Sequence, residues 1–154
     1  MFTLLRFPTK QQSTVWLKRR QKVPASKIAL EMKVSRPFVS KATKIAEARI
    51  RKLLENAASI SRIKIHHISE KHGLILGYSP SIQAETYITF SPELGIQTWY
   101  QHQGDCDTCS EYSTCNDTLR QIADEWDVAI PKKMKPTEIA DHIFGTIMRE
   151  LRWK

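Results

Sequence analysis

The sequence predicts an α+β protein, because two different periodicities divide the 154-residue chain. From Thr9 to about Ala58, apolar residues recur with helical spacing. From Ser61 they alternate with a period of two, as in strands that bury one face. We therefore expect three N-terminal helices with a long third one, a small antiparallel β-meander, a Cys-rich loop and two C-terminal helices.

Capping and breaker residues place the three N-terminal helices. The first lies within "PTKQQSTVWLKRR" and buries Val15 and Trp16, and the second begins near Pro24. Ser35 is a suitable N-cap for the third helix, and Pro37 falls in its first turn, where the missing N–H costs nothing. These signals predict a third helix that runs to about residue 58.

The remaining elements follow from alternation and from turn residues. Four short strands are predicted, separated by turns rich in Gly, Pro and Ser: "RIKIHHI", "LILGY", "ETYITF" and "IQTWYQ". After the cysteines, two helical segments flank the breaker "AIPKKMKP": "NDTLRQIADEWDV" and "KPTEIADHIFGTIMREL". Charge and period both change near residues 58–62, so we expect domains at 1–60 and 61–154.

The charge of the chain is divided unequally between its two halves. The net charge is +8, but residues 1–67 carry 16 Lys and Arg against three acids, a net +13. Residues 68–154 carry eight against 13, a net −5. A basic first half is typical of proteins with a polyanionic partner, although a solvated basic face is the alternative.

The segment "VPASKIALEMKVSRPFVSKATKIAEARI" has the spacing of a helix-turn-helix. Ala29 lies where two helices cross closely, Val34 fills the turn, and Val39 and Ala42 bury the inner face of the third helix. The outward face is then the one that can enter a major groove, with N-terminal residues near base edges and flanking cations near phosphates.

Residues 7–58 resemble a known group of DNA-binding domains. The stretches "FPTKQQSTVWLKRR", "ASKIALEMKVSRPFVSK" and "AEARIRKLLENA" are similar to the helix-turn-helix of sigma-factor region 4 and LuxR-type regulators, and most similar to archaeal Tfx-type transcription regulators. The resemblance implies a sequence-specific transcription regulator. It covers about a third of the chain, and it departs from the group at Lys33, where Gly is usual.

The outward positions and nearby cations give the predicted DNA-binding residues. They are Ser35, Arg36, Pro37, Ser40, Lys41 and Lys44 on the third helix, with Arg19, Arg20 and Lys27 before it. Arg36 is the candidate for a base contact, because a guanidinium can donate two bonds to guanine, and a phosphate contact is its alternative. The lysines and the other arginines are candidates for phosphate neutralisation.

Two apolar stripes are candidates for a homodimer interface. One lies on the third helix at Val39, Ala42, Ala46, Ile50, Leu53 and Ala57, with spacing close to that of a coiled coil. The other lies on the last helix at Ile139, Ile143, Phe144, Ile147 and Leu151. Packing against the chain's own C-terminal half is the alternative for the first stripe.

All three cysteines lie in the stretch "HQGDCDTCSEYSTC", with the pattern His102-x3-Cys106-x2-Cys109-x5-Cys115. Three thiolates and an imidazole suit a tetrahedral structural zinc site, and an iron–sulfur cluster accepts similar spacing. Zinc is slightly favoured over a cluster, and free thiols are the third interpretation. Other histidines could replace His102, and we expect helix N-terminal amides to stabilise the Cys115 thiolate.

These features favour a transcription regulator with a metal-binding C-terminal domain, for which a response to redox state is one hypothesis. The alternative is an RNA-binding or transcription-machinery accessory protein with a structural zinc site. The sequence contains no Gly-rich phosphate loop, nucleophile elbow or HExxH pair, so we do not expect an enzyme. It has neither a secretory h-region nor an apolar run of membrane-spanning length, which predicts a cytoplasmic protein.

Overall fold

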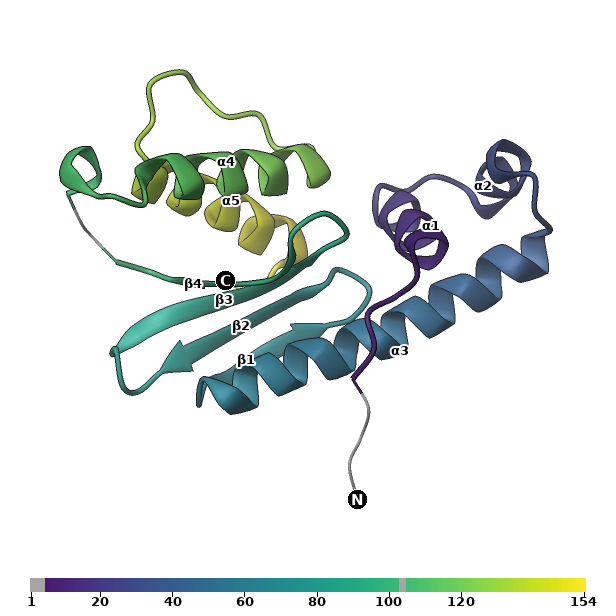
Figure 1. Ribbon diagram of the computed structural model, residues 1–154, viewed down its shortest axis with the longest axis horizontal. Coiled ribbons are helices and arrows are strands. Elements are labelled where there is room, and N and C mark those ends of the chain that lie inside the picture. Colours follow the sequence, from purple (N-terminus) through teal and green to yellow (C-terminus); the bar gives the residue numbers. More distant parts are fainter. Residues whose placement is uncertain (1–4, 103–104) are drawn as a thin grey trace. The chain divides into compact units, whose positions relative to one another are not determined.

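A computed structural model of the protein describes residues 5–102 and 105–154 and confirms the α+β class (Figure 1). Its helices are α1 (Lys10–Arg20), α2 (Ala25–Met32), α3 (Arg36–Ile60), α4 (Tyr112–Glu125) and α5 (Pro136–Leu151), with a short 3-10 helix η1 (Cys106–Thr108). The strands are β1 (Lys64–Ser69), β2 (Leu74–Ser79), β3 (Ala84–Ser91) and β4 (Gly95–Tyr100). The predicted order of elements is therefore confirmed, and each boundary lies within a few residues of its prediction.

The chain divides into two compact units, Met1–Thr98 and Trp99–Lys154, rather than at residues 58–62. The expected domains 1–60 and 61–154 are corrected accordingly. The physical reason is that α3 does not end with the helical head. Its C-terminal half packs against β1 and β3, so the helices and the strands share one unit.

The sheet of the meander has the strand order β1-β2-β3-β4. Neighbouring strands β1 and β2, and β2 and β3, pair antiparallel, with Ile75 opposite both Ile68 and Ile88. A β-bulge interrupts β1 between Ile65 and His67. Strand β1 is an edge strand in this order.

The apolar stripe of α3 packs within the first unit. Val39, Ala46 and Ile50 are fully buried, and Leu53 is nearly so. Helix α3 packs against α1 and α2 through its first half and against the sheet through its second. The stripe is therefore used inside the chain, which is the alternative to the coiled-coil pairing considered from the sequence.

Trp16 connects α1 to the turn between β1 and β2. Its indole is 1% exposed, its Nε1 donates to the Glu70 carbonyl oxygen at 3.0 Å, and its ring meets Phe90 edge-on at 5.2 Å between centroids. The Arg20 guanidinium lies 4.9 Å from the Trp16 ring centroid and donates to the His72 carbonyl oxygen at 3.0 Å. We call this group of residues the Trp16 cluster.

In the second unit, α4 packs against α5, and their apolar faces include Leu119, Ile122, Ile139 and Ile143, all buried (Figure 1). Lys135, the N-cap residue of α5, binds Asp107 of η1 at 2.9 Å. The hydrogen bond from Lys135 to Asp107 raises the pKa of the lysine. Within residues 5–102 and 105–154, no helix has both the length and the apolar character of a membrane span.

The Trp16 cluster predicts a large penalty for a side chain at Gly73. This residue has φ +68°, and a Cβ there would lie 2.7 Å from two carbons of the Trp16 ring. We expect Gly73→Ala to lower the free energy of unfolding by about 2–4 kcal/mol, from left-handed strain and overpacking together. Urea unfolding measured by tryptophan fluorescence checks this.

Gly145→Ala is the matched control, because a Cβ in α5 at this position meets only the Arg149 Nη1 atom, at 3.5 Å. Removing a glycine from a helix interior should leave stability unchanged or raise it by up to about 1 kcal/mol. Equal effects of the two substitutions would contradict the packing described for Gly73.

Candidate nucleic-acid interface

The departure at Lys33 predicts a tighter or differently shaped turn between α2 and α3, but the turn keeps a left-handed residue at this position. Lys33 caps α2 with φ 57° and ψ 45°, the left-handed conformation in which the resembled group usually has Gly. The Val34 N–H donates to the Ala29 carbonyl oxygen at 3.0 Å, and Val34 packs against the core of the three helices. A non-glycine residue pays about 1 kcal/mol for this conformation, so the turn is retained at a cost.

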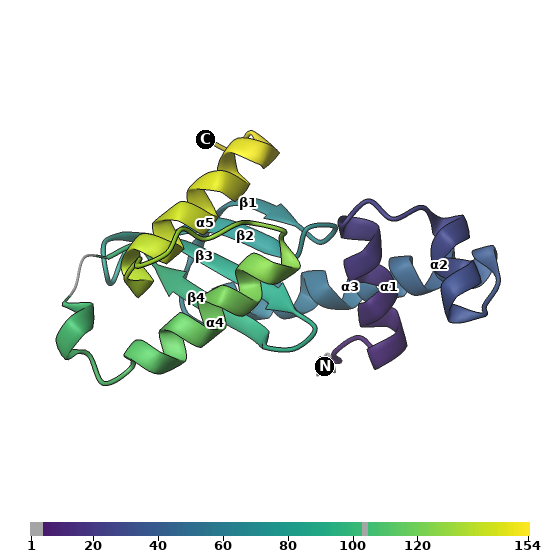
Figure 2. The same ribbon diagram turned by 90° about the horizontal axis from the view of Figure 1, so that it is seen from above.

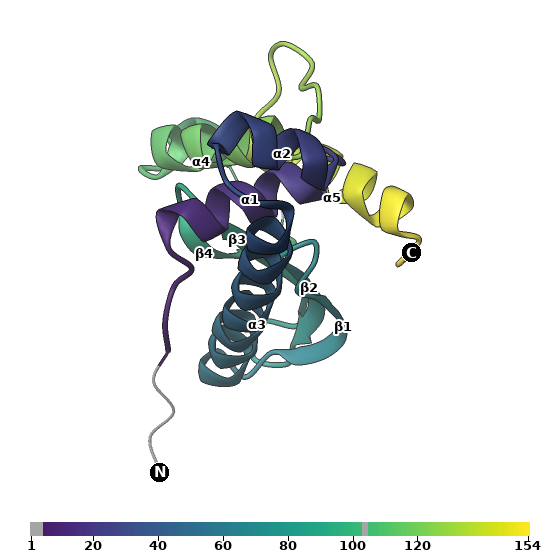
Figure 3. The ribbon, with the colours of Figure 1, turned by 90° about the vertical axis from the view of Figure 1, so that its right-hand side faces the viewer.

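Burial around the turn fixes which side of α3 faces outward. Ile28 and Ala29 of α2 form a core cluster with Val15, Val39 and Ala42. Figures 2 and 3 show the arrangement: α1 and α2 lie at the N-terminal end of α3, and α1 crosses over it. The remaining positions of the first turns of α3 are left at the surface.

The structure brings six of the predicted residues together on this exposed end of α3. Ser35 is the N-cap and accepts a hydrogen bond from the Phe38 N–H at 3.1 Å. The other five are exposed on the first three turns of the helix: Arg36, Pro37, Ser40, Lys41 and Lys44. Among the residues that the structure describes, no acid forms an ion pair with Arg36, Lys41 or Lys44.

The other three predicted residues make contacts of their own. Arg20 is partly buried in the Trp16 cluster, so its guanidinium is directed at a carbonyl oxygen within the unit. Arg19 is exposed and donates to the Val23 carbonyl oxygen at 3.1 Å. Lys27 lies 4.0 Å from Glu31, which also accepts from Lys18 at 3.0 Å. The bond from Lys18 is the main reason that the pKa of Glu31 is lowered.

Sequence reasoning did not select Phe38, which lies between Arg36 and Ser40 and is 37% exposed. A partly exposed phenyl ring on a recognition surface can contact the methyl group of thymine. The signal was present in the sequence, because Phe38 falls outside the buried stripe that begins at Val39. Helical spacing alone places it on the surface.

The three thiols of the cysteine loop differ in exposure. Cys106 is buried in η1, with its Sγ 3.6 Å from the Thr137 hydroxyl. Cys109 is exposed, and Cys115 is partly buried in the first turn of α4. Burial first, and then the neighbouring Cys109, Glu111 and Cys106, raise the pKa of the Cys115 thiol.

The expected stabilisation of a Cys115 thiolate by helix amides is therefore wrong for this geometry. The Cys115 N–H already donates to the Glu111 carbonyl oxygen at 2.9 Å, and the side chain is partly desolvated next to an acid. Helix N-terminal amides lower a thiol pKa only where they face the sulfur unpaired.

The candidate ligands of the loop do not form a metal site in the described residues. The His102 Nδ1 atom lies 2.7 Å from the Tyr100 carbonyl oxygen, and the imidazole is exposed. Residues 103 and 104, which join His102 to the loop, lie outside the described residues. Across the described residues, no three His, Cys, Asp or Glu side chains converge as ligands of one ion. The loop brings the donors into one neighbourhood without arranging them as a coordination sphere.

Comparisons of the chain with protein families, curated proteins and solved structures gave no match.

The exposures of the three thiols predict an order of alkylation. In chelator-treated native protein, we expect iodoacetamide to modify Cys109 first because it is exposed. Cys115 should follow, because it is partly buried and its pKa is raised, and Cys106 should react last. Mass spectrometry of peptides after timed quenching gives the three rates.

Urea-unfolded protein is the control, since unfolding exposes all three thiols and should bring their rates close together. Equal rates in the native protein would contradict the burial of Cys106.

Proposed function

We propose that the protein is a sequence-specific DNA-binding transcription regulator that presents the N-terminal turns of α3 to a major groove. One observation carries the proposal: the left-handed turn at Lys33 sets α2 against α3 while Arg36, Lys41 and Lys44 remain outward and without acidic partners among the described residues. A groove about 12 Å wide admits one α-helix, and here one side of the first turns of α3 is exposed.

The residues of this surface have different roles in the proposal. Arg36, at the first position of the helix, donates two bonds to guanine O6 and N7, and Phe38, in the same first turn, contacts a thymine methyl group. Lys41 and Lys44, further along the same exposed side, neutralise phosphates. Ser35 holds the first turn closed by capping it.

The cysteine loop supplies the regulatory part of the proposal. The pattern His102-x3-Cys106-x2-Cys109-x5-Cys115 supports binding of zinc or an iron–sulfur cluster, for which the described residues form no ready coordination sphere. Such an ion would hold Cys106, Cys109 and Cys115 as thiolates, with His102 as the fourth candidate. It would then protect all three thiols from alkylation, and metal analysis of freshly purified protein tests it directly.

A homodimer is the proposed DNA-bound form, because two copies can bind two half-sites of a palindromic operator. The α3 stripe is packed within the first unit, so the interface must use another surface. Sedimentation at tens of micromolar tests the oligomeric state.

Reversal of charge on the exposed side of α3 should weaken DNA binding. We expect the double substitution K41E/K44E to weaken binding to a mixed-sequence 30-bp duplex at least about tenfold at 100 mM salt, because two phosphate contacts become repulsive. It should also reduce the slope of log affinity against log salt by about two. Fluorescence anisotropy over a salt series measures both quantities.

The double substitution K132E/K133E is the matched control: both lysines are exposed, and the change in net charge is identical. Equal losses in the two variants would mean that overall charge, rather than the α3 surface, governs binding. Single strands and structured RNA form the comparison series. Preference for structured RNA over duplex would instead favour an accessory protein of the transcription machinery.

Arg36→Ala tests specificity separately from affinity. We expect it to reduce the ratio of operator to random-duplex affinity about 5- to 150-fold, the equivalent of about 1–3 kcal/mol for one bidentate base contact. The operator is first identified by selection from a random duplex library with the wild-type protein. A proportional loss on both duplexes would assign Arg36 to a phosphate instead.

A further inference from the structure

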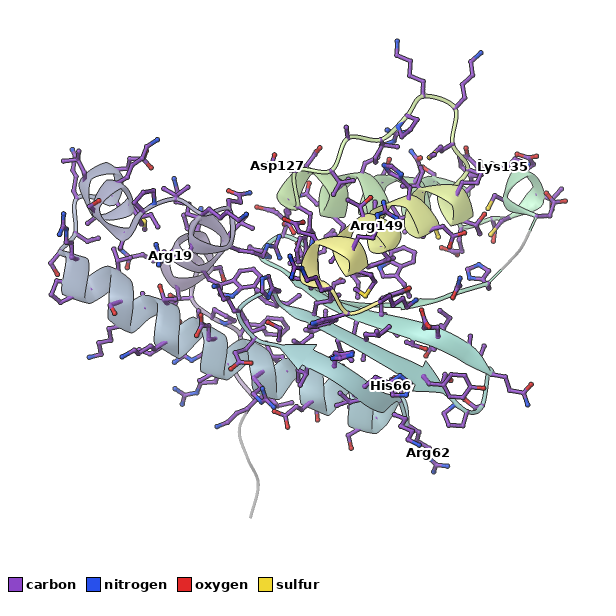
Figure 4. All side chains as sticks on the ribbon, turned by 180° about the vertical axis from the view of Figure 1, so that it is seen from behind. Arg19, Arg62, His66, Asp127, Lys135 and Arg149 are labelled. Carbon is purple, nitrogen blue, oxygen red and sulfur yellow. The ribbon has the colours of Figure 1, made fainter. Side chains whose placement is uncertain are left out.

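A second cationic surface lies at the opposite end of α3 from the exposed residues Arg36, Lys41 and Lys44. Arg62 follows the C-cap of α3, and Lys64 and His66 lie on the edge strand β1 that begins there. All three are exposed, and Figure 4 shows Arg62 and His66 at the same end of the first unit, away from Arg19. We call these three residues the β1 edge surface.

The sequence segments that form and flank the β1 edge surface contain no acidic residue. Residues 56–69 contain no acid, and residues 74–83, which include the paired strand β2, carry no charged side chain at all. The acids around this stretch are engaged: Glu55 and Glu70 both pair with Arg51, and Glu85 accepts from the Tyr87 hydroxyl at 2.9 Å. The described residues provide no ion-pair partner for Arg62 or Lys64.

Lys64 and His66 lie on β1, at the open edge of the sheet. Strand β1 has a neighbour on one side only in the sheet order, and its bulge between Ile65 and His67 re-aims the residue between them, His66. Tyr78, 37% exposed, stands opposite Lys64 on β2 and adds a hydroxyl to the same surface. Arg62 and Lys64 carry the positive charges of this surface, and as separate long side chains each can face a different phosphate.

We infer that the β1 edge surface is a second, sequence-independent binding site for the phosphates of duplex DNA. The choice of duplex DNA as the partner rests on the proposed function, because the α3 surface and the β1 edge surface lie at the two ends of α3 within one compact unit. Helix α3 has 25 residues and is therefore about 37 Å long, close to one turn of a duplex at about 34–36 Å. A duplex held at one end of α3 and running alongside it presents phosphates to the other end.

Lysine on an edge strand also has a simpler function, which is to prevent pairing with another edge. One feature of the β1 edge surface is not explained by edge protection: Arg62 lies before β1 and outside the ladder. A substitution also separates the two functions. Lys64→Glu keeps the edge charged, and so protected, but it reverses the attraction for phosphate.

The test is the double substitution R62E/K64E, measured by fluorescence anisotropy on random-sequence duplexes of 10 and 30 bp. We expect a loss of affinity of at least about tenfold on the 30-bp duplex and a salt slope reduced by about two. The 10-bp duplex should lose less, because a duplex of about one turn that is centred on the α3 surface ends before it reaches the β1 edge surface. Sedimentation should give the same oligomeric state as the wild type.

The outcomes separate this inference from the proposed function. Affinity equal to wild type on the 30-bp duplex overturns the β1 edge surface and leaves recognition by α3 intact. A loss no larger than that of K132E/K133E overturns it as well. If R62E/K64E loses affinity while K41E/K44E does not, the edge surface stands and the proposed role of α3 fails. Equal losses on single strands and duplexes would reject duplex DNA as its partner.

Discussion

The burial of Trp16 is the interaction on which the arrangement of the first unit depends. Its ring lies between α1 and the sheet, edge-on to Phe90, and its only polar atom donates to the turn between β1 and β2. A buried indole N–H without a partner would be costly, so this turn must stay where it is for α1 to remain packed. The buried Trp16 ring then requires glycine at position 73, because only a residue without a Cβ fits beside the ring.

One consequence is that the three-helix head and the sheet form a single body. Helix α3 contributes its first turns to the outward surface and its second half to the sheet, and the Trp16 cluster joins α1 to that same sheet. The orientation of the exposed α3 end is therefore set by packing on both sides of the helix. In the proposed regulator, a signal must act on the whole unit rather than on a head that swivels on a linker.

The elements of this fold could be predicted from the sequence because each has a local cause. Ser35 and Pro37 mark the start of α3, and period-two alternation marks the strands. The left-handed conformation of Lys33 could not be predicted, because a lysine has no local preference for it. The domain boundary could not be predicted, because it depends on contacts that are distant along the chain. The bond from Trp16 to Glu70 spans 54 residues, and no periodicity in either segment indicates it.

The candidate site, too, could be predicted only where it depends on local spacing and not on contacts that are distant along the chain. Helical spacing correctly placed Arg36, Lys41 and Lys44 on the exposed side of α3, since this depends only on which neighbours are buried. Arg20 was predicted to bind DNA together with these residues, because it is a cation close to them in the sequence. Its guanidinium, however, is directed at the Trp16 ring and at a carbonyl oxygen. Net charge treats all cations alike, whereas a phosphate interacts best with those whose donors are free. The +13 of residues 1–67 therefore overstates the number of cations that can bind phosphates. The salt dependence of binding should follow the free cations, because only a contact that neutralises a phosphate releases its counterion.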